Sequence, residues 1–209
     1  MGAVIKNKVP KGQEPFLGTG HGGEVVKSLK ILVDGRDVKL TGTKSQPLRG
    51  KIIKVLKESI IGPLAHKSTI TLTPQGLEQS FHFQVVGDTA KLLNMYMFMS
   101  IWDKPYSRWL TFTGQLNKGT FKHDNKFINT GQSDWIGVFN PETGIAGVCV
   151  YRLPERFKSF FWDRRVDNKH YIKYYPLKKQ GAGFSGTAFI SAFQTTSGAF
   201  AGDAEQQAT

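Results

Sequence analysis

Hydrophobic and polar residues alternate along most of this chain with the two-residue period of a β-strand. The clearest example is Leu77–Val86. Phe81 and Phe83 point to one face of this segment, while Glu78 and His82 point to the other. The pattern predicts a strand that covers a core with its apolar face and leaves its polar face outside.

Turn residues separate the alternating segments. Asp34-Gly35 predicts a two-residue hairpin. Gly62-Pro63 marks Ile60–His66 as a connector, while Asn117-Lys118-Gly119 and Asn140–Gly144 have the composition of turns. The expected strands are Leu29–Val33, Arg36–Leu40, Gly50–Glu58, Lys67–Thr73, Leu77–Val86, Leu92–Trp102, Trp109–Thr113, Thr120–Lys122, Asp134–Phe139, Ile145–Tyr151, Lys158–Trp162, His170–Tyr175 and Phe184–Gln194.

This spacing predicts an all-β fold with little or no helix. Strands that recur about every 8–12 residues with turn signals between them are typical of a sandwich or barrel, and the long segments favour a large antiparallel β-sandwich, a supersandwich. We expect residues 24–196 to form a single domain. Residues 1–23 are predicted to be a flexible arm, and residues 197–209 a flexible or short helical tail.

The net charge of the chain indicates which classes of binding partner it favours. The 209 residues carry 28 Lys and Arg against 16 Asp and Glu, a formal charge of +12. Such an excess attracts polyanions, among them acidic glycans and nucleic acid. The basic residues are spread along the chain rather than gathered in one block, which makes nucleic acid the less favoured partner. A basic surface that is merely solvated remains an alternative.

Several features bound the class of protein. No run approaches the roughly 18 apolar residues of a membrane span, and the first 23 residues lack the apolar core of a signal peptide. The single cysteine, Cys149, lies in an apolar stretch and is expected to be a buried core residue. Phosphate-binding, dinucleotide-binding, zinc and nucleophile-elbow motifs are missing from the sequence, so we expect no cofactor and no metal.

Two histidines are candidates for a site. Strand alternation places His82 on the same face as Glu78, although positions four residues apart lie about 13 Å from each other in a strand. An acid–base pair would therefore need a substrate between them, and a solvated outer face is the alternative. His66 lies in the predicted connector, which would overhang one end of the sandwich.

Two clusters combine aromatic and basic residues where a strand meets a loop. The first contains Trp162, Arg164, His170 and Tyr171. Trp and Tyr offer flat apolar faces that stack on sugar rings, and Arg binds carboxylate or sulfate in a bidentate manner. The alternative is that the Trp residues close the ends of the sandwich and that the charges form surface ion pairs.

The second cluster contains Trp102, Arg108 and Trp109 around a proline loop. The same two readings apply to it. A glycan groove would require the two clusters to face each other.

The run Trp135-Ile-Gly-Val-Phe-Asn-Pro-Glu-Thr-Gly-Ile-Ala-Gly-Val resembles the late hairpins of galactose-mutarotase-like β-supersandwich domains. Such domains occur in sugar epimerases, polysaccharide lyases and ancillary domains of glycoside-processing enzymes, and the resemblance covers about residues 50–194. It implies a sugar lying across a concave sheet face. The implied catalytic residues are His82, Arg108 and Tyr171. The implied substrate-binding residues are Glu78, Trp102, Trp109, Trp162, Arg164 and His170.

Three functions follow from these readings. The first is binding or processing of carbohydrate, in particular acidic oligo- or polysaccharide, with an epimerase- or mutarotase-like or lyase-like activity if the chain is an enzyme. It predicts that Trp102, Arg108, Trp162 and His82 share one concave surface. The second is a non-catalytic interaction module of a larger protein or assembly, for which these residues lie on different faces. The third is a nucleic-acid binder, whose affinity would fall steeply with salt.

Overall fold

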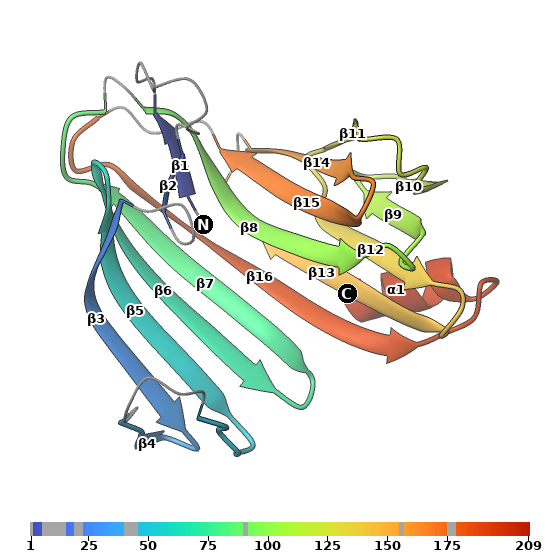
Figure 1. The fold of residues 1–209 in the computed structure, drawn as a ribbon, viewed down its shortest axis with the longest axis horizontal. Coiled ribbons are helices and arrows are strands. Elements are labelled where there is room, and N and C mark those ends of the chain that lie inside the picture. Colours follow the sequence, from blue (N-terminus) through green and yellow to red (C-terminus); the bar gives the residue numbers. More distant parts are fainter. Residues whose placement is uncertain are drawn as a thin grey trace.

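The computed structural model describes residues 2–5, 16–18, 23–39, 46–89, 92–154, 157–174 and 179–209. Two antiparallel sheets pack face to face (Figure 1), which confirms the predicted β-sandwich. The smaller sheet has the order β11 (Lys126–Gly131), β14 (Phe157–Asp163), β15 (Asp167–Tyr174), β8 (Leu92–Asp103), β1 (Gly2–Ile5) and β2 (Phe16–Gly18).

The larger sheet has ten strands. Its order is β10 (Leu116–Thr120), β9 (Arg108–Phe112), β12 (Trp135–Asn140), β13 (Ile145–Arg152), β16 (Gly183–Gln194), β7 (Gly76–Val85), β6 (Leu64–Thr73), β5 (Ile53–Ile61), β3 (Glu24–Val33) and β4 (Arg36–Asp37). The edge strands β10 and β11 lie on the same side of the sandwich (Figure 1).

The main core lies between the sheets. Alternation along each strand turns Met97, Phe161 and Ile172 of the six-stranded sheet toward Phe83 and Val138 of the ten-stranded sheet, and all five are at most 1% exposed. Removal of this apolar surface from water is the main favourable term in the fold. The prediction that Phe81 and Phe83 face inward is confirmed.

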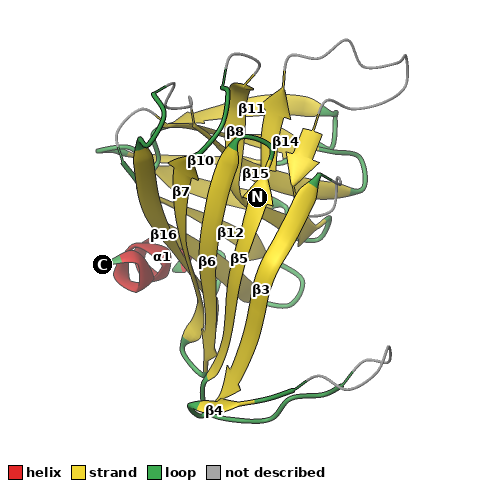
Figure 2. Ribbon diagram, turned by 90° about the vertical axis from the view of Figure 1, so that its left-hand side faces the viewer, coloured by secondary structure: helices red, strands yellow, loops and turns green. Residues whose placement is uncertain are grey.

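A second, smaller core lies on the outer side of the ten-stranded sheet. The single helix α1 (Phe200–Ala208) packs there against β12 and β13 (Figure 2). Phe200 stacks on Phe139 with 5.1 Å between ring centroids. A Cβ at Gly137 would lie 3.3 Å from the Phe200 ring, so this glycine lets the helix approach the sheet closely. Of the two alternatives for the tail, the structure shows the short helix.

Two predicted turns have different outcomes. The Asp34-Gly35 hairpin is confirmed: both residues have positive φ, 49° and 81°, as a type I′ turn requires. The predicted connector Ile60–His66 is wrong, because β5 continues to Ile61 and β6 begins at Leu64. Gly62, with a φ of 56°, allows the chain to reverse within two residues.

Other differences concern short strands. The expected turn Asn117-Lys118-Gly119 lies inside β10 instead, and β11 was not predicted. Gly119 is tolerated within a strand because its bare backbone accommodates the ring of Trp109. Residues 2–5 and 16–18 of the predicted arm form β1 and β2, and β1 pairs with β8; the rest of the arm lies outside the described residues.

Candidate functional site

The outer face of the six-stranded sheet carries a concentration of aromatic side chains. In β14, Phe161 and its alternate neighbours are buried between the sheets, so Phe160 and Trp162 point outward. In β15, His170 and Ile172 are buried, and Tyr171 points outward beside Phe160. These positions follow from the two-residue period of the strands.

The outward rings touch one another across four strands. Phe127 of β11 lies 5.4 Å from both Phe160 and Trp162, measured between ring centroids. Phe160 stacks on Tyr171 at 5.2 Å, and Tyr171 lies 5.6 Å from Tyr96 of β8. We call these five residues the aromatic row. Phe127, which the sequence analysis did not select, is 65% exposed at the open edge of the sheet.

Basic side chains accompany the row on the same face. Lys169 lies opposite Trp162, and Lys158 lies directly opposite Lys173. The guanidinium of Arg164 is 5.0 Å from the centroid of the Trp162 ring, which is within the range of a cation–π contact. The aromatic row and these four residues together form the aromatic–lysine face. Lys158 and Lys173 thus place two positive charges side by side on this face.

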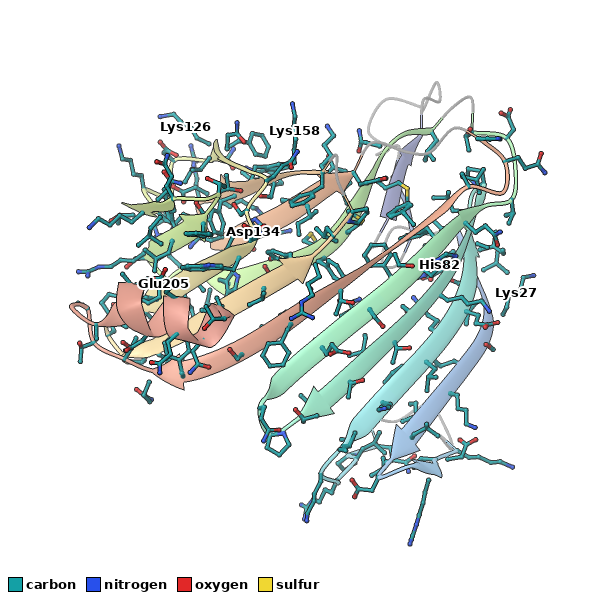
Figure 3. The ribbon with its side chains drawn as sticks, turned by 180° about the vertical axis from the view of Figure 1, so that it is seen from behind. Lys27, His82, Lys126, Asp134, Lys158 and Glu205 are labelled. Carbon is teal, nitrogen blue, oxygen red and sulfur yellow. The ribbon has the colours of Figure 1, made fainter. Side chains whose placement is uncertain are left out.

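Exposed aliphatic residues extend the same face. Met99 and Ile101 of β8 are 46% and 52% exposed. Large exposed apolar patches rimmed by polar residues are typical of interaction sites. Figure 3 shows the side chains of Lys126 and Lys158 projecting from this part of the molecule, far from His82.

Three predicted site residues lie between the sheets instead. Trp102 covers Gly147, where a Cβ would be 2.4 Å from its ring, and its Nε1 donates to Ser100 Oγ at 3.3 Å. Trp109 packs against Phe161 at 5.9 Å. These tryptophans therefore fill the interior of the sandwich, which is the alternative that the sequence left open.

His170 is also an interior residue. It is fully buried, and its Nδ1 lies 3.0 Å from the hydroxyl oxygen of Tyr151. Burial lowers the pKa of His170 to about 3, so the ring is neutral near pH 7. The role of His170 is to fill and order the core at this point.

The remaining candidates lie on the outer side of the ten-stranded sheet. His82 is exposed, with Nδ1 2.8 Å from Ser185 Oγ. Glu78 lines a separate hollow with Arg152 beside the end of α1. Arg108 of β9 lies 6.0 Å from the Phe139 ring. The expectation that Trp102, Arg108, Trp162 and His82 share one concave surface is therefore wrong. Strand parity places Trp102 between the sheets, Trp162 on the outer side of the six-stranded sheet, and Arg108 and His82 on the outer side of the ten-stranded sheet.

A buried polar cluster was only partly anticipated. His66 lies within β6, where its ring stacks on Phe83 at 4.6 Å. Its Nδ1 is 3.1 Å from Ser59 Oγ, which donates to Glu24 Oε1 at 2.7 Å, and Lys57 Nζ contacts the same carboxylate oxygen at 2.7 Å. Burial, followed by the charge of Lys57, lowers the pKa of His66 to about 4. The imidazole is thus held neutral as part of a structural network.

The ten-stranded sheet extends beyond the six-stranded sheet on the side of β3, β5 and β6 (Figure 1). Its inner face there is aliphatic, with Leu29 55% and Leu72 47% exposed and Val55 and Ile70 between them in the register. None of these four residues is aromatic. These four side chains therefore offer no ring for stacking on a sugar.

Comparisons with known proteins bear on the fold. No protein-family model matches the chain, and no curated relative matches it. Among solved structures, an alpha-galactosidase from Lactobacillus brevis aligns with 93% of this chain at a TM-score of 0.53 and 10% identity. An alpha-N-acetylgalactosaminidase from Bifidobacterium bifidum aligns with 82% at a TM-score of 0.52 and 8% identity. What they share is the fold.

The chain spans about a third of each of these enzymes, 31% in both cases. A third similar structure, of a family GH36 alpha-galactosidase from Geobacillus stearothermophilus in complex with stachyose, has a TM-score of 0.50 at 8% identity and is covered to 28%, with 83% of this chain aligned. The fold of this chain thus occurs within carbohydrate-active enzymes. Among the described residues, no three His, Cys, Asp or Glu side chains are grouped as metal ligands, and no helix is long and apolar enough to cross a membrane.

Proposed function

We propose that the chain is a carbohydrate-binding domain that holds an extended acidic glycan on its aromatic–lysine face. The observation that carries the proposal is the contiguous aromatic row with lysines on both sides of it. The fold likeness to α-galactosidase-type enzymes supports a carbohydrate-related role, and the galactose-mutarotase-like resemblance of the sequence agrees with it.

The chemistry of this face suits a charged polysaccharide. Aromatic rings bury the C–H face of a sugar, and ammonium groups bind carboxylates or sulfates with charge-assisted hydrogen bonds. Lys169, Tyr171 and Lys173 alternate along β15, so about 7 Å separates each from the next. A linear chain that crosses the strands along the aromatic row would therefore stack on rings and have lysines on either side of it.

Binding without catalysis fits the placement of the predicted catalytic residues. His82 and Arg108 lie on the outer side of the ten-stranded sheet, and Tyr171 lies on the outer side of the other sheet. Tyr171 is thus on the opposite side of the sandwich from the other two groups, and three strands lie between β9, which carries Arg108, and β7, which carries His82, so the three groups cannot act on one bond. An epimerase- or lyase-like reaction therefore finds no support in the arrangement of these residues, and the non-catalytic reading is the one that we propose.

A binding screen tests the proposal. Trigalacturonate, an alginate oligomer and a sulfated oligosaccharide serve as acidic probes, with methyl-esterified trigalacturonate and a single-stranded oligothymidylate for comparison. We expect the acidic glycans to bind and their affinity to fall with ionic strength, because salt screens exposed charges. Binding of the oligothymidylate alone would replace a glycan with a nucleic acid as the ligand.

Substitutions locate the binding surface. Phe160→Ala and Tyr171→Ala are each expected to weaken binding of trigalacturonate about fivefold to tenfold, since a stacked ring contributes roughly 0.5–1.5 kcal/mol beyond area burial. His82→Ala is the matched control, because it removes an exposed ring from the other sheet. Equal affinities in all three variants would rule out the aromatic–lysine face.

A further inference from the structure

A hollow opens at the side of the sandwich, where the edge strands of the two sheets meet. It lies between β10 and β11 and has a volume of about 390 Å³. Ligand pockets in proteins start at about 300 Å³. Its lining includes Trp109, Gly119, Lys122, Asp124, Lys126 and Phe127. Phe127 also belongs to the aromatic row, so the hollow adjoins the end of the aromatic–lysine face.

Trp109 lines this hollow and carries an unused hydrogen-bond donor. Gly119 pairs with Trp109 across the strands, and a Cβ there would lie 2.3 Å from the ring and 2.9 Å from Nε1. The indole therefore lies flat against the backbone of β10. Its Nε1 is buried and has no hydrogen-bond partner among the residues that the structure describes. Buried N–H groups without a partner are rare because they lose their bond to water, so an acceptor at this position would be stabilising.

The loop before β11 and the first residue of β11 supply an acceptor and a donor side by side. Lys126 Nζ lies 2.8 Å from Asp124 Oδ2. The hydrogen bond from Lys126 lowers the pKa of Asp124, so the carboxylate is ionised at neutral pH. A carboxylate next to an ammonium matches two neighbouring sugar hydroxyls, one of which donates while the other accepts.

The second acidic group of the hollow has a different role. The carboxylate of Asp163 is 2% exposed and accepts the backbone N–H groups of Lys122, at 2.6 Å, and His123, at 2.9 Å. It is already occupied by these bonds and fixes the loop that carries the ligand-facing groups. With Lys122 and Lys126 against Asp124 and Asp163, the charges of the hollow balance, in contrast to the lysine-rich face beside it.

We infer that this hollow binds one neutral, hydroxyl-bearing sugar ring at the end of the glycan that the aromatic–lysine face holds. The exposed face of Phe127 stacks on the ring. A sugar oxygen accepts the Trp109 Nε1–H, and the Asp124–Lys126 pair binds two adjacent hydroxyls. The inference rests on the proposed glycan-binding function for the chain that continues along the row, but the hollow itself is selective for a ring without charge.

The indole N–H signals of the protein allow a direct test. The chain has four tryptophans, and in a ¹⁵N-labelled sample the Trp109 signal is the one that disappears in Trp109→Phe. This substitution keeps an aromatic ring against Phe161 and removes the donor. We expect methyl-esterified trigalacturonate to shift the Trp109 signal, and Trp109→Phe to bind this neutral probe about fivefold more weakly, the net worth of one hydrogen bond.

Because Trp109 packs in the core, a second variant at an exposed residue tests the hollow without disturbing the core. Asp124→Asn changes an exposed loop residue and is expected to weaken binding of the neutral probe by a similar factor. His82→Ala, on the outer side of the ten-stranded sheet, is the control that leaves this affinity unchanged. An unmoved Trp109 signal at saturation, or wild-type affinity in both Trp109→Phe and Asp124→Asn, would overturn the inference.

Failure of the hollow and failure of the proposed function give different results. If trigalacturonate binding depends on Phe160 and Tyr171 while the Trp109 signal never moves, the face binds glycan and the hollow does not. If the neutral probe shifts the Trp109 signal while acidic glycans do not bind the aromatic–lysine face, the hollow is a sugar site and the proposed function is wrong. If neither responds, both are wrong.

Discussion

Acid is expected to destabilise this protein through two buried histidines. Burial lowers the pKa of His66 to about 4 and that of His170 to about 3, whereas in the unfolded chain both titrate near 6.5. Below pH 6.5 the unfolded chain thus binds more protons than the folded one. The stability that the neutral rings provide is complete above pH 6.5 and is lost as the pH falls toward the folded-state values.

The size of the effect follows from the same pKa values. Between about pH 7.5 and about pH 5, each histidine costs about 2 kcal/mol of unfolding free energy, and the two together cost about 4 kcal/mol. Domains are stable by only about 5–15 kcal/mol in total. A loss of this size would be a large fraction of the stability of the fold.

Urea unfolding followed by tryptophan fluorescence at a series of pH values measures this loss. His66→Asn keeps a polar group near Ser59, and His170→Gln keeps one near Tyr151; each is expected to reduce the pH-dependent loss by about half. His82→Asn, at an exposed position, serves as the control. If both buried-site variants lost as much unfolding free energy between pH 7.5 and pH 5 as the wild-type protein, the acid sensitivity could not be assigned to these rings.

Three further predictions concern packing. Gly147→Val would place a Cβ 2.4 Å from the ring of Trp102 and should destabilise the fold by about 1–3 kcal/mol, whereas Gly198→Ala, with no atom within 4 Å, should leave the melting temperature unchanged. Burial raises the pKa of the Cys149 thiol to about 12, so a thiol reagent should react only after unfolding, and rapid reaction of the native protein would contradict the structure. Phe200→Ala removes the anchor of α1 and should cost about 3–5 kcal/mol in chemical denaturation; a cost below 1 kcal/mol would mean that the helix is not docked.

Local patterns in the sequence predicted the fold class well. The alternation in Leu77–Val86 identified β7 and its two faces, because a strand with one buried face needs an apolar residue at every second position. The Asp34-Gly35 turn was identified because few residue pairs adopt two positive φ angles in succession. Both features are encoded within ten residues of the chain.

The clustering of aromatic and basic residues along the sequence, by contrast, did not predict which of them lie on the surface. Trp162 and Tyr171 lie on the outer face of their sheet, but the neighbouring His170 points into the core because adjacent strand residues face opposite ways. Trp102 and Trp109 were grouped with them by type, although both fill the interior. Counting alternation through each cluster would have separated the inward residues from the outward ones.

Features that depend on long-range pairing were missed. Phe127 lies in the short, Lys- and Asn-containing strand β11, and only its pairing with β14, some thirty residues later, places it beside Trp162. The run Phe127-Ile128-Asn129-Thr130 places two apolar residues before two polar ones, so it lacks the alternation that marks a half-buried strand. The contact of His66 with Ser59 likewise needs the register of β5 and β6, which no local pattern specifies.

The central claim, that the outer face of the six-stranded sheet binds acidic glycan, is tested most directly by mapping trigalacturonate onto the backbone. In a ¹⁵N-labelled sample titrated with trigalacturonate, we expect amide shifts to concentrate on Phe160, Trp162, Tyr171 and Lys173, and to be reduced at higher salt. The outer residues of β6 and β7 should remain unchanged. Shifts confined to Thr69 and His82, or no shifts at millimolar ligand, would contradict the account.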